Sequence, residues 1–563
     1  NVDAVGLITA RSGLEIGLAG VGGTITAAGI VTAPQIKTGG TLHNVGLGSG
    51  ILASLTTGNH NVAIGVDALK VGTTAHQNVA VGNRALDAGT TANDTVAVGF
   101  EALTANTTGH ANLAVGHRVM QSNTTGSQNT ALGRLALGAN TTASGNIAVG
   151  YHALYANTTG TKNVGVGNSA LATITTGDSS TAVGFKALAT ATGSNNTAVG
   201  TQALMATTTG GNNVAVGQNA MASNTTGADN VGLGLNALNA NTTGTQNTAV
   251  GRNALDSNTT NSYNTAVGYE ALTALNGGQY QTAFGYQAGK ALTTASSSTA
   301  IGSKAMLVAT TASQCTAVGE GSMIALTTGN YNVAVGGQTL EAITTQANNT
   351  AIGFQALEAN TADNNTAVGY DALVANTTGA ANCAFGYTAL DENSTGGNNN
   401  SFGAYSLSAY TASDNNAFGT YALHNTTTGT FNAAFGHRAM LANTTGQRNT
   451  AVGAYALDAN TTVSDCTAVG YAALTAANTG TNNCAFGANS LESNTSGHSN
   501  TGTGRYTLYQ NTTASYNAAF GNNAMYTNTT GEYNTALGAS TLQGNTTASD
   551  NTAVGYQACY VSS

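Results

Sequence analysis

A seventeen-residue phrase repeats with almost no interruption from residue 44 to the last residue of the chain. One copy runs from Asn365 to Ala381 and reads NTAVGYDALVANTTGAA. If the first glycine of each copy is taken as a marker, 31 copies follow one another from Gly48 to Gly555, and the marker spacing falls to 16 at only three places. So regular a period over so long a chain predicts stacked, equivalent coils rather than a globular domain.

The length of the repeat excludes most repeat architectures. Seventeen residues are too few for helix pairs of about 33 residues or for leucine-rich repeats of about 20–29 residues, but they suffice for short strands and turns. The chain has 74 glycines and one proline, and only 7% of its residues are charged, a composition that does not suit helices. We therefore expect an all-β fold, a parallel β-solenoid of about 31 coils of 17 residues. At ~4.8 Å per coil the rod would be roughly 150 Å long.

Each copy reads as strand, turn, strand and turn. The first strand covers Thr366 to Val368, Gly369 permits a bend, and a second strand is expected around Ala372 and Leu373. The large apolar residues fall one before the marker glycine and four after it, so these two positions are the predicted core. Examples are the pairs Val149 and Leu154, Val199 and Leu204, and Val368 and Leu373.

In-register stacking aligns identical polar residues into ladders along the stack. One ladder is expected from Asn376 and its equivalents, and another from Thr378 and its equivalents. The asparagine equivalents are Asn106, Asn123, Asn140, Asn157 and Asn460. Side-chain amides stacked in this way can hydrogen-bond from coil to coil, which explains these residues structurally. The Asn-Thr-Thr string is also a glycosylation sequon, but a repeat consensus produces sequons automatically.

The bulk properties restrict the domain organisation and the partners. Residues 1–43 lack the repeat and are expected to form a β-rich shoulder or linker, and residues 44–563 the solenoid. The chain opens with Asn rather than Met, which suggests a processed or partial chain. The net charge is −9 and there is no basic stripe, so we expect no nucleic-acid partner. The sequence also lacks an apolar segment of the kind that inserts into a membrane, so we expect no membrane insertion.

The five cysteines are too few for a disulfide framework. Cys383 and Cys484 lie three residues before their marker glycines, a position expected to face inward. Cys315 and Cys466 lie four before theirs. Within each of these two pairs the cysteines are too many coils apart to bridge within one chain, so free thiols are expected.

No catalytic or metal-binding constellation emerges from the titratable residues. The nine histidines are dispersed, and His117 and His437 follow marker glycines at a position that varies freely among copies. Asp371 and its neighbours could supply the two carboxylates of a glycosidase, but any solvated surface could do so. The chain is therefore expected to be no enzyme and to need no cofactor or metal.

Aromatic residues concentrate in the distal coils. Phenylalanine before the marker glycine is expected to fill a slightly wider core there, and it occurs at Phe284, Phe385, Phe402, Phe418, Phe435, Phe486 and Phe520. Tyrosines directly after the glycine should point outward. Exposed aromatic side chains on a rigid rod suit contacts with sugars or proteins. The candidate surface-binding residues are Tyr370, Tyr387, Tyr471 and Tyr556.

The repeat core, as in Asn61-Val62-Ala63-Ile64-Gly65, resembles the head repeats of trimeric autotransporter adhesins. The resemblance covers some 520 residues and implies a left-handed parallel β-roll in which three chains pack side by side as a homotrimer. The adhesin repeat is shorter, so the loop at Asn-Thr-Thr-Gly should be larger here, and that family's stalk and membrane anchor are not recognisable. Ala367, opposite in parity to Val368, is expected to allow close approach between chains.

Both ends of the chain resemble phage proteins. Residues 1–13, NVDAVGLITARSG, look like segments of structural and tail-fibre proteins of marine cyanobacterial phages. Residues 556–563, YQACYVSS, are similar to the stretch just upstream of the intramolecular chaperone domain of phage fibres and tailspikes. That domain trimerises the fibre and cleaves itself off after a serine, so the resemblance implies that such a domain was removed.

These features together favour a homotrimeric tail fibre or other virion appendage. Its expected partners are itself, other virion tail proteins and a host-surface glycan or protein, and its expected location is the virion. A trimeric adhesin at the cell surface is the alternative. An ice-binding solenoid is a further alternative, disfavoured because Thr377 and Thr378 should point to opposite faces and give only single files. A glycan-degrading tailspike is the third alternative function.

Overall fold

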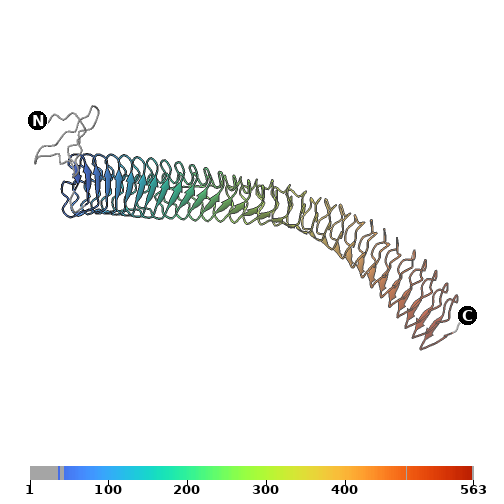
Figure 1. The fold of residues 1–563 in the computed structure, drawn as a ribbon. Coiled ribbons are helices and arrows are strands. Elements are labelled where there is room, and N and C mark those ends of the chain that lie inside the picture. The colour runs from blue at the N-terminus through green and yellow to red at the C-terminus, as the bar shows by residue number, and fades with distance from the viewer. Residues whose placement is uncertain (1–35, 39–42, 477, 561–563) are drawn as a thin grey trace, which may run out of the picture. The chain divides into compact units, whose positions relative to one another are not determined.

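The computed structural model describes residues 36–38, 43–476 and 478–560, and it is all-β, with no helix among these residues. The chain winds as a parallel β-solenoid in which each coil of about 17 residues contributes one three-residue strand. Figure 1 shows these strands as a row of arrows, one per coil. The expected all-β solenoid and its period are therefore confirmed.

The strands of the described residues are β1 (Ile36–Thr38), β2 (Val45–Leu47), β3 (Val62–Ile64), β4 (Val79–Val81), β5 (Val96–Val98), β6 (Leu113–Val115), β7 (Thr130–Leu132), β8 (Ile147–Val149), β9 (Val164–Val166), β10 (Thr181–Val183), β11 (Thr197–Val199), β12 (Val214–Val216), β13 (Val231–Leu233), β14 (Thr248–Val250), β15 (Thr265–Val267), β16 (Thr282–Phe284), β17 (Thr299–Ile301), β18 (Thr316–Val318), β19 (Val333–Val335), β20 (Thr350–Ile352), β21 (Thr366–Val368), β22 (Cys383–Phe385), β23 (Asn400–Phe402), β24 (Asn416–Phe418), β25 (Ala433–Phe435), β26 (Thr450–Val452), β27 (Thr467–Val469), β28 (Cys484–Phe486), β29 (Thr501–Thr503), β30 (Ala518–Phe520), β31 (Thr535–Leu537) and β32 (Thr552–Val554).

The contacts divide the chain into two compact units. The first comprises residues 1–253 and 257–260, and the second comprises residues 254–256 and 261–563. Within each unit every strand pairs in parallel with the strand of the next coil, in register, as β3 does with β4 and β21 with β22. The exception is β1, which pairs antiparallel with β2. The rest of the shoulder expected at residues 1–43 lies outside the described residues, apart from His43.

The core is formed by alanine and leucine rather than by valine and leucine. In the coil of β21, Ala367 and Leu373 are fully buried. Val368 is half-buried, and its equivalent Val199 is 37% exposed. The predicted core is thus right for leucine and wrong for the residue before the marker glycine. A three-residue strand has one parity facing inward, and the narrow coil gives that parity to the small alanine. For the same reason Ala367 cannot line a contact between chains.

The expected second strand is absent from the described coils. The segment around Ala372 and Leu373 is a turn, and three non-glycine residues of this coil adopt the left-handed conformation: Asp371 (φ 53°), Leu373 (φ 54°) and Ala381 (φ 58°). Such residues are uncommon in proteins and persist only where the surroundings over-determine them. Here the neighbouring coil does so, because the Leu373 N–H donates to the carbonyl of Ala389 at 3.0 Å.

The marker glycine is required by the distance between coils. Gly386 has φ 143°, and a Cβ placed on it would lie 2.6 Å from the carbonyl carbon and oxygen of Gly403 in the next coil. Both contacts are with backbone atoms, which cannot move aside without separating the coils. The strict period of the sequence therefore follows from a steric demand repeated in each coil.

Two buried asparagine ladders connect the coils. In the expected one, the Asn393 amide donates to Oδ1 of Asn376 at 2.9 Å, and Asn376 donates to Asn360 at 2.7 Å. The second ladder lies four residues before the marker glycine and was not foreseen as a ladder: the Asn382 N–H donates to Oδ1 of Asn365 at 2.9 Å. In the second ladder Asn382 also donates its amide to the carbonyl of Gly396 in the next coil, whereas in the first ladder Asn376 donates to Gly379 of its own coil. Both ladders join neighbouring coils, so the buried amides stabilise stacking.

The first asparagine ladder is interrupted at Tyr410. The threonine ladder is formed at the position of Thr377, not at the expected position of Thr378. Tyr410, in a 16-residue coil, takes the asparagine position, and its buried hydroxyl donates to the carbonyl of Ser413 at 3.0 Å. Burial raises the pKa of Tyr410 far above its ordinary value. Thr377 donates its hydroxyl to the carbonyl of Ser394 at 2.8 Å, whereas Thr378 is exposed.

Candidate functional site

The first surface of interest is the outer strand face, defined as the first and third residues of strands β2–β32. Its third residue is Val, Ile, Leu or Phe in nearly every coil and is half-buried or exposed, as with Ile64 (38%), Ile352 (40%) and Phe520 (40%). With roughly 50 Å² open on each such side chain, ten consecutive coils expose roughly 500 Å², the size of patch that marks an interaction site. The third residues of the outer strand face thus form an apolar file with no partner in the single chain, beside a file of first residues that are Thr in about half of the coils.

The phenylalanines belong to this face and do not widen the core. Phe385, Phe402, Phe418 and Phe435 stack in succession, with ring centroids 4.7–4.8 Å apart and interplanar angles of 6–7°. Phe435 is 41% exposed. The prediction of a wider distal core is wrong because the residue before the marker glycine points outward in every coil.

The second surface is the aromatic stripe, a run of rings one or two residues after the marker glycine in eight consecutive coils. Its members are Phe354, Tyr370, Tyr387, Tyr405, Tyr421, His437, Tyr455 and Tyr471, and each ring contacts the next with centroids 5.0–6.5 Å apart. The stripe lies in the second unit. Three of these seven pairs are stacked and four are edge-on, and both arrangements stabilise aromatic pairs.

Three of the four predicted surface tyrosines belong to the aromatic stripe. Tyr370, Tyr387 and Tyr471 are 45%, 48% and 57% exposed, and Tyr556 is 75% exposed but lies outside the stripe. Their binding role stays a prediction.

Sequence reasoning missed the remaining members of the stripe, above all Tyr405, Tyr421 and Tyr455. These three lie two residues after the glycine rather than one. A search for aromatic residues at spacings of 16 to 18 would have found the whole run.

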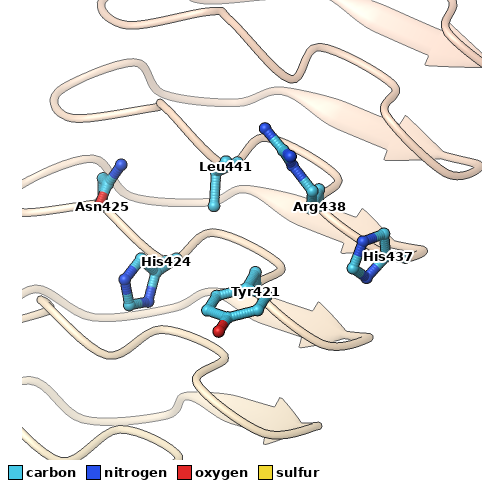
Figure 2. A pocket seen from close by; sticks show the side chains of 6 residues that line it. All are labelled: Tyr421, His424, Asn425, His437, Arg438 and Leu441. Carbon is cyan, nitrogen blue, oxygen red and sulfur yellow. The ribbon is translucent and has the colours of Figure 1, made fainter.

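A pocket opens in the middle of the aromatic stripe. It has a volume of about 380 Å³ and is lined by Tyr421, His424 and Asn425 from one coil and by His437, Arg438 and Leu441 from the next. Figure 2 shows these six side chains around a common space. His437 is exposed, as expected from the sequence.

Arg438 is only partly satisfied by its ion pair. Its Nη2 lies 3.3 Å from Oδ2 of Asp458, while Nε of Arg438 and Oδ1 of Asp458 are buried without a partner. Burial raises the pKa of Asp458, and the nearby guanidinium opposes that rise. The Arg438 guanidinium also lies 5.3 Å from the ring centroid of Tyr455. Because Nε is buried, any donor that Arg438 offers to a ligand comes from its two terminal nitrogens.

Carboxylates of neighbouring coils interact electrostatically near Asp371, the region where the sequence offered a carboxylate pair. Burial raises the pKa of Glu358, and the adjacent carboxylates of Glu341 and Asp371 raise it further. Burial likewise raises the pKa of Asp371. By contrast, Glu270 is 2.6 Å from the ammonium of Lys290, and hydrogen bonds from Lys290 and Gln287 lower its pKa to about 2.

All five cysteines are free thiols, but their positions differ from those expected. Cys315 and Cys466 are buried in the second asparagine ladder, and burial raises the pKa of Cys466 to about 11. Cys383 and Cys484 are half-buried on the outer strand face, so their predicted inward position is wrong. Cys559 is exposed.

No group of three or more His, Cys, Asp or Glu side chains in the described part of the chain is placed to hold a metal ion. The same residues include no helix with the length and hydrophobicity needed to cross a membrane. No protein-family model and no curated protein matches the chain. The functional argument therefore depends on the outer strand face, the aromatic stripe and its pocket.

Proposed function

We propose that the chain is a structural, host-recognising tail fibre or similar virion appendage, built as a homotrimer of left-handed β-rolls. It attaches to a host-surface glycan or protein through many weak contacts and is held in the virion by other tail proteins. The observation that carries this proposal is the outer strand face, whose apolar third residue recurs through both units.

This face favours association with further copies of the same chain. Each copy carries an identical apolar file with the spacing of the strands, so two or three chains can align their files coil by coil. The third residues of β22–β25, for example, form an unbroken row of stacked phenylalanine rings. In a trimer with a threefold axis, the apolar third residues of each chain would pack against the other two chains, so none of these rows would stay exposed to solvent. The resemblance of Asn61–Gly65 to adhesin heads supports the same arrangement and its left-handed winding.

The aromatic stripe supports attachment. Its rings recur at the spacing of the coils, so a homotrimer presents many similar contacts in parallel. Linking weak contacts in this way raises the overall avidity without a strong single site. No chemical reaction is required, so the proposed role is not enzymatic.

Single-cysteine accessibility tests the proposed interface. In a chain whose native cysteines are replaced by serine, Phe435→Cys reports on the outer strand face and Phe431→Cys on the turn of the same coil. Both phenylalanines are open in the single chain, at 41% and 61% exposure. We expect a maleimide to react quickly with the turn variant and at least tenfold more slowly with the strand-face variant, until the assembly is dissociated. Equal rates in the native protein contradict the interface.

Attachment is tested with labelled protein on a panel of cyanobacterial cells. The triple replacement of Tyr370, Tyr387 and Tyr471 by Ala should strongly reduce cell binding, while Tyr331→Ala, a variant at a 58%-exposed tyrosine outside the aromatic stripe, should not. Binding that is unaffected by the triple replacement contradicts the role of the stripe. A secretion signal in the complete gene would favour the cell-surface adhesin instead.

One observation favours the ice-binding alternative more than the sequence did. The turn threonines do not provide two files on one side, but the outer strand face does, because Thr366 and Val368 point to the same side. The phenylalanine rows of β22–β25 interrupt this array in the second unit. Thermal hysteresis, the gap between the melting and freezing temperatures of a solution of the purified chain, tests this alternative. A stable monomer that shows hysteresis supports ice binding, and a solution without hysteresis rules it out.

A further inference from the structure

We propose that the pocket between Tyr421 and Arg438 binds a saccharide that carries an anionic group, a carboxylate or a phosphate, on its ring. The inference depends on the proposed attachment function, because it names the ligand class of that surface. The volume of about 380 Å³ lies within the range of ~300–1,000 Å³ typical of small-molecule sites.

The pocket exists because ring stacking breaks at one step of the aromatic stripe. Tyr421 stacks on Tyr405 with centroids 5.0 Å apart and an interplanar angle of 3°. On its other side His437 approaches at 6.5 Å and 76°, edge-on rather than parallel. His424 of the same coil also meets Tyr421 nearly perpendicular, at 5.3 Å and 89°, so Tyr405 is the one contacting ring that lies parallel to Tyr421. An open aromatic face with an apolar floor, here Leu441, suits the C–H face of a sugar ring.

The polar groups around this face are donors and acceptors, and only Arg438 is purely a donor; Nδ1 of His424 already donates to the carbonyl of Tyr405 at 3.0 Å. His424 and Asn425 lie on one side, and His437 and Arg438 on the other. No carboxylate lines the pocket, although the chain has 23 acidic against 14 basic residues. Two carboxylates lie behind the lining: Asp458 pairs with Arg438, and Asp391 interacts electrostatically with His424. Neither is among the residues that face the cavity.

Arg438 gives the pocket its preference for an anion. A guanidinium has five donors, and the ion pair with Asp458 uses one nitrogen, Nη2, at 3.3 Å, while Nε is buried without a partner. The N–H groups of the two terminal nitrogens that Asp458 does not use can form the charge-assisted hydrogen bonds that carboxylate and phosphate groups prefer. The anionic substituent would therefore lie at Arg438, with the sugar ring on Tyr421 and its hydroxyls near His424 and Asn425.

The test measures binding of single sugars to the full chain by ligand-observed NMR, with glucuronate, glucose 6-phosphate and glucose as probes. We expect at least one anionic probe to bind tenfold or more tightly than glucose, and the comparison of the two anions identifies the source of the charge. Arg438→Gln should remove this preference, and Tyr421→Leu should weaken all three probes. Arg448→Gln is the matched control, because Arg448 is an exposed arginine paired with Asp465 outside the pocket.

Equal binding of glucose and both anions, no binding of any probe, or an unchanged preference in Arg438→Gln overturns the pocket proposal. The wild-type comparison needs no variant, so a folding defect cannot obscure it. Cell attachment is measured separately. Sugar binding without attachment leaves the pocket intact and contradicts the proposed function, whereas attachment that survives Arg438→Gln with sugar binding lost places host recognition elsewhere.

Discussion

Replacing Asn382 by alanine is the sharpest test of how the coils hold together. Oδ1 of Asn382 accepts the backbone N–H of Asn399 at 3.0 Å, and its Nδ2 donates to the carbonyl of Gly396 at 2.8 Å. In Asn382→Ala the Gly396 carbonyl keeps a bond from Asn393 at 3.0 Å. The N–H of the fully buried Asn399 loses its acceptor, which costs about 1–3 kcal/mol.

Hydrogen exchange is the appropriate assay, because a stack of coils need not unfold in a single step. Where exchange follows local opening, a loss of about 1–3 kcal/mol speeds it by roughly 5- to 150-fold. We expect this acceleration in peptides that contain Asn399, decaying over neighbouring coils. Thr378→Ala is the control, because Thr378 is exposed on the preceding turn. Exchange that stays within twofold of the wild type in Asn382→Ala refutes the stabilising role of the ladder.

Three further predictions follow from the geometry of single coils. Gly386→Ala should separate two coils, because its Cβ meets backbone atoms at 2.6 Å, and limited proteolysis should then cut at that coil; an uncut chain contradicts the steric argument. Maleimide should label the exposed Cys559 at once and Cys466, with its pKa raised to about 11 by burial, only after unfolding, as mass spectrometry will show. The hydrogen bond from Lys290 lowers the pKa of Glu270 to about 2. The stability that Glu270 adds relative to Glu270→Gln should therefore be present at pH 5 and disappear as the pH falls toward 2. Urea unfolding midpoints of the two proteins that differ equally at both pH values contradict this.

Periodicity, repeat length and composition together predicted the β-solenoid, and the period is strict because the demand for glycine recurs from coil to coil. It could not assign the faces of the strand. Ala367 and Val368 are adjacent strand residues, so their side chains point to opposite sides. Hydrophobicity favours valine for the core, but the coil is narrow and buries Ala367 instead. The turn around Leu373 was read as a strand because its left-handed backbone, φ 54°, leaves no signal in a non-glycine residue.

The candidate site was predictable only in part for a similar reason. Tyr370 and Tyr387 were found because they follow the marker glycine directly, and the structure places them in contact at 5.3 Å. Tyr421 and His437 lie at different positions of their coils, so only the three-dimensional stack brings them together. How much of the Arg438 guanidinium is satisfied by Asp458 depends on the geometry of one ion pair, which no pattern in the sequence encodes.

The measurement that most directly tests the central claim is the native mass of the purified chain by light scattering, before and after mild denaturation. The chain mass is 55.5 kDa. A homotrimer closed over its outer strand faces predicts three times this mass and resistance to dissociation at micromolar concentration. A stable species of one chain mass, with the outer strand face open to solvent, contradicts the account.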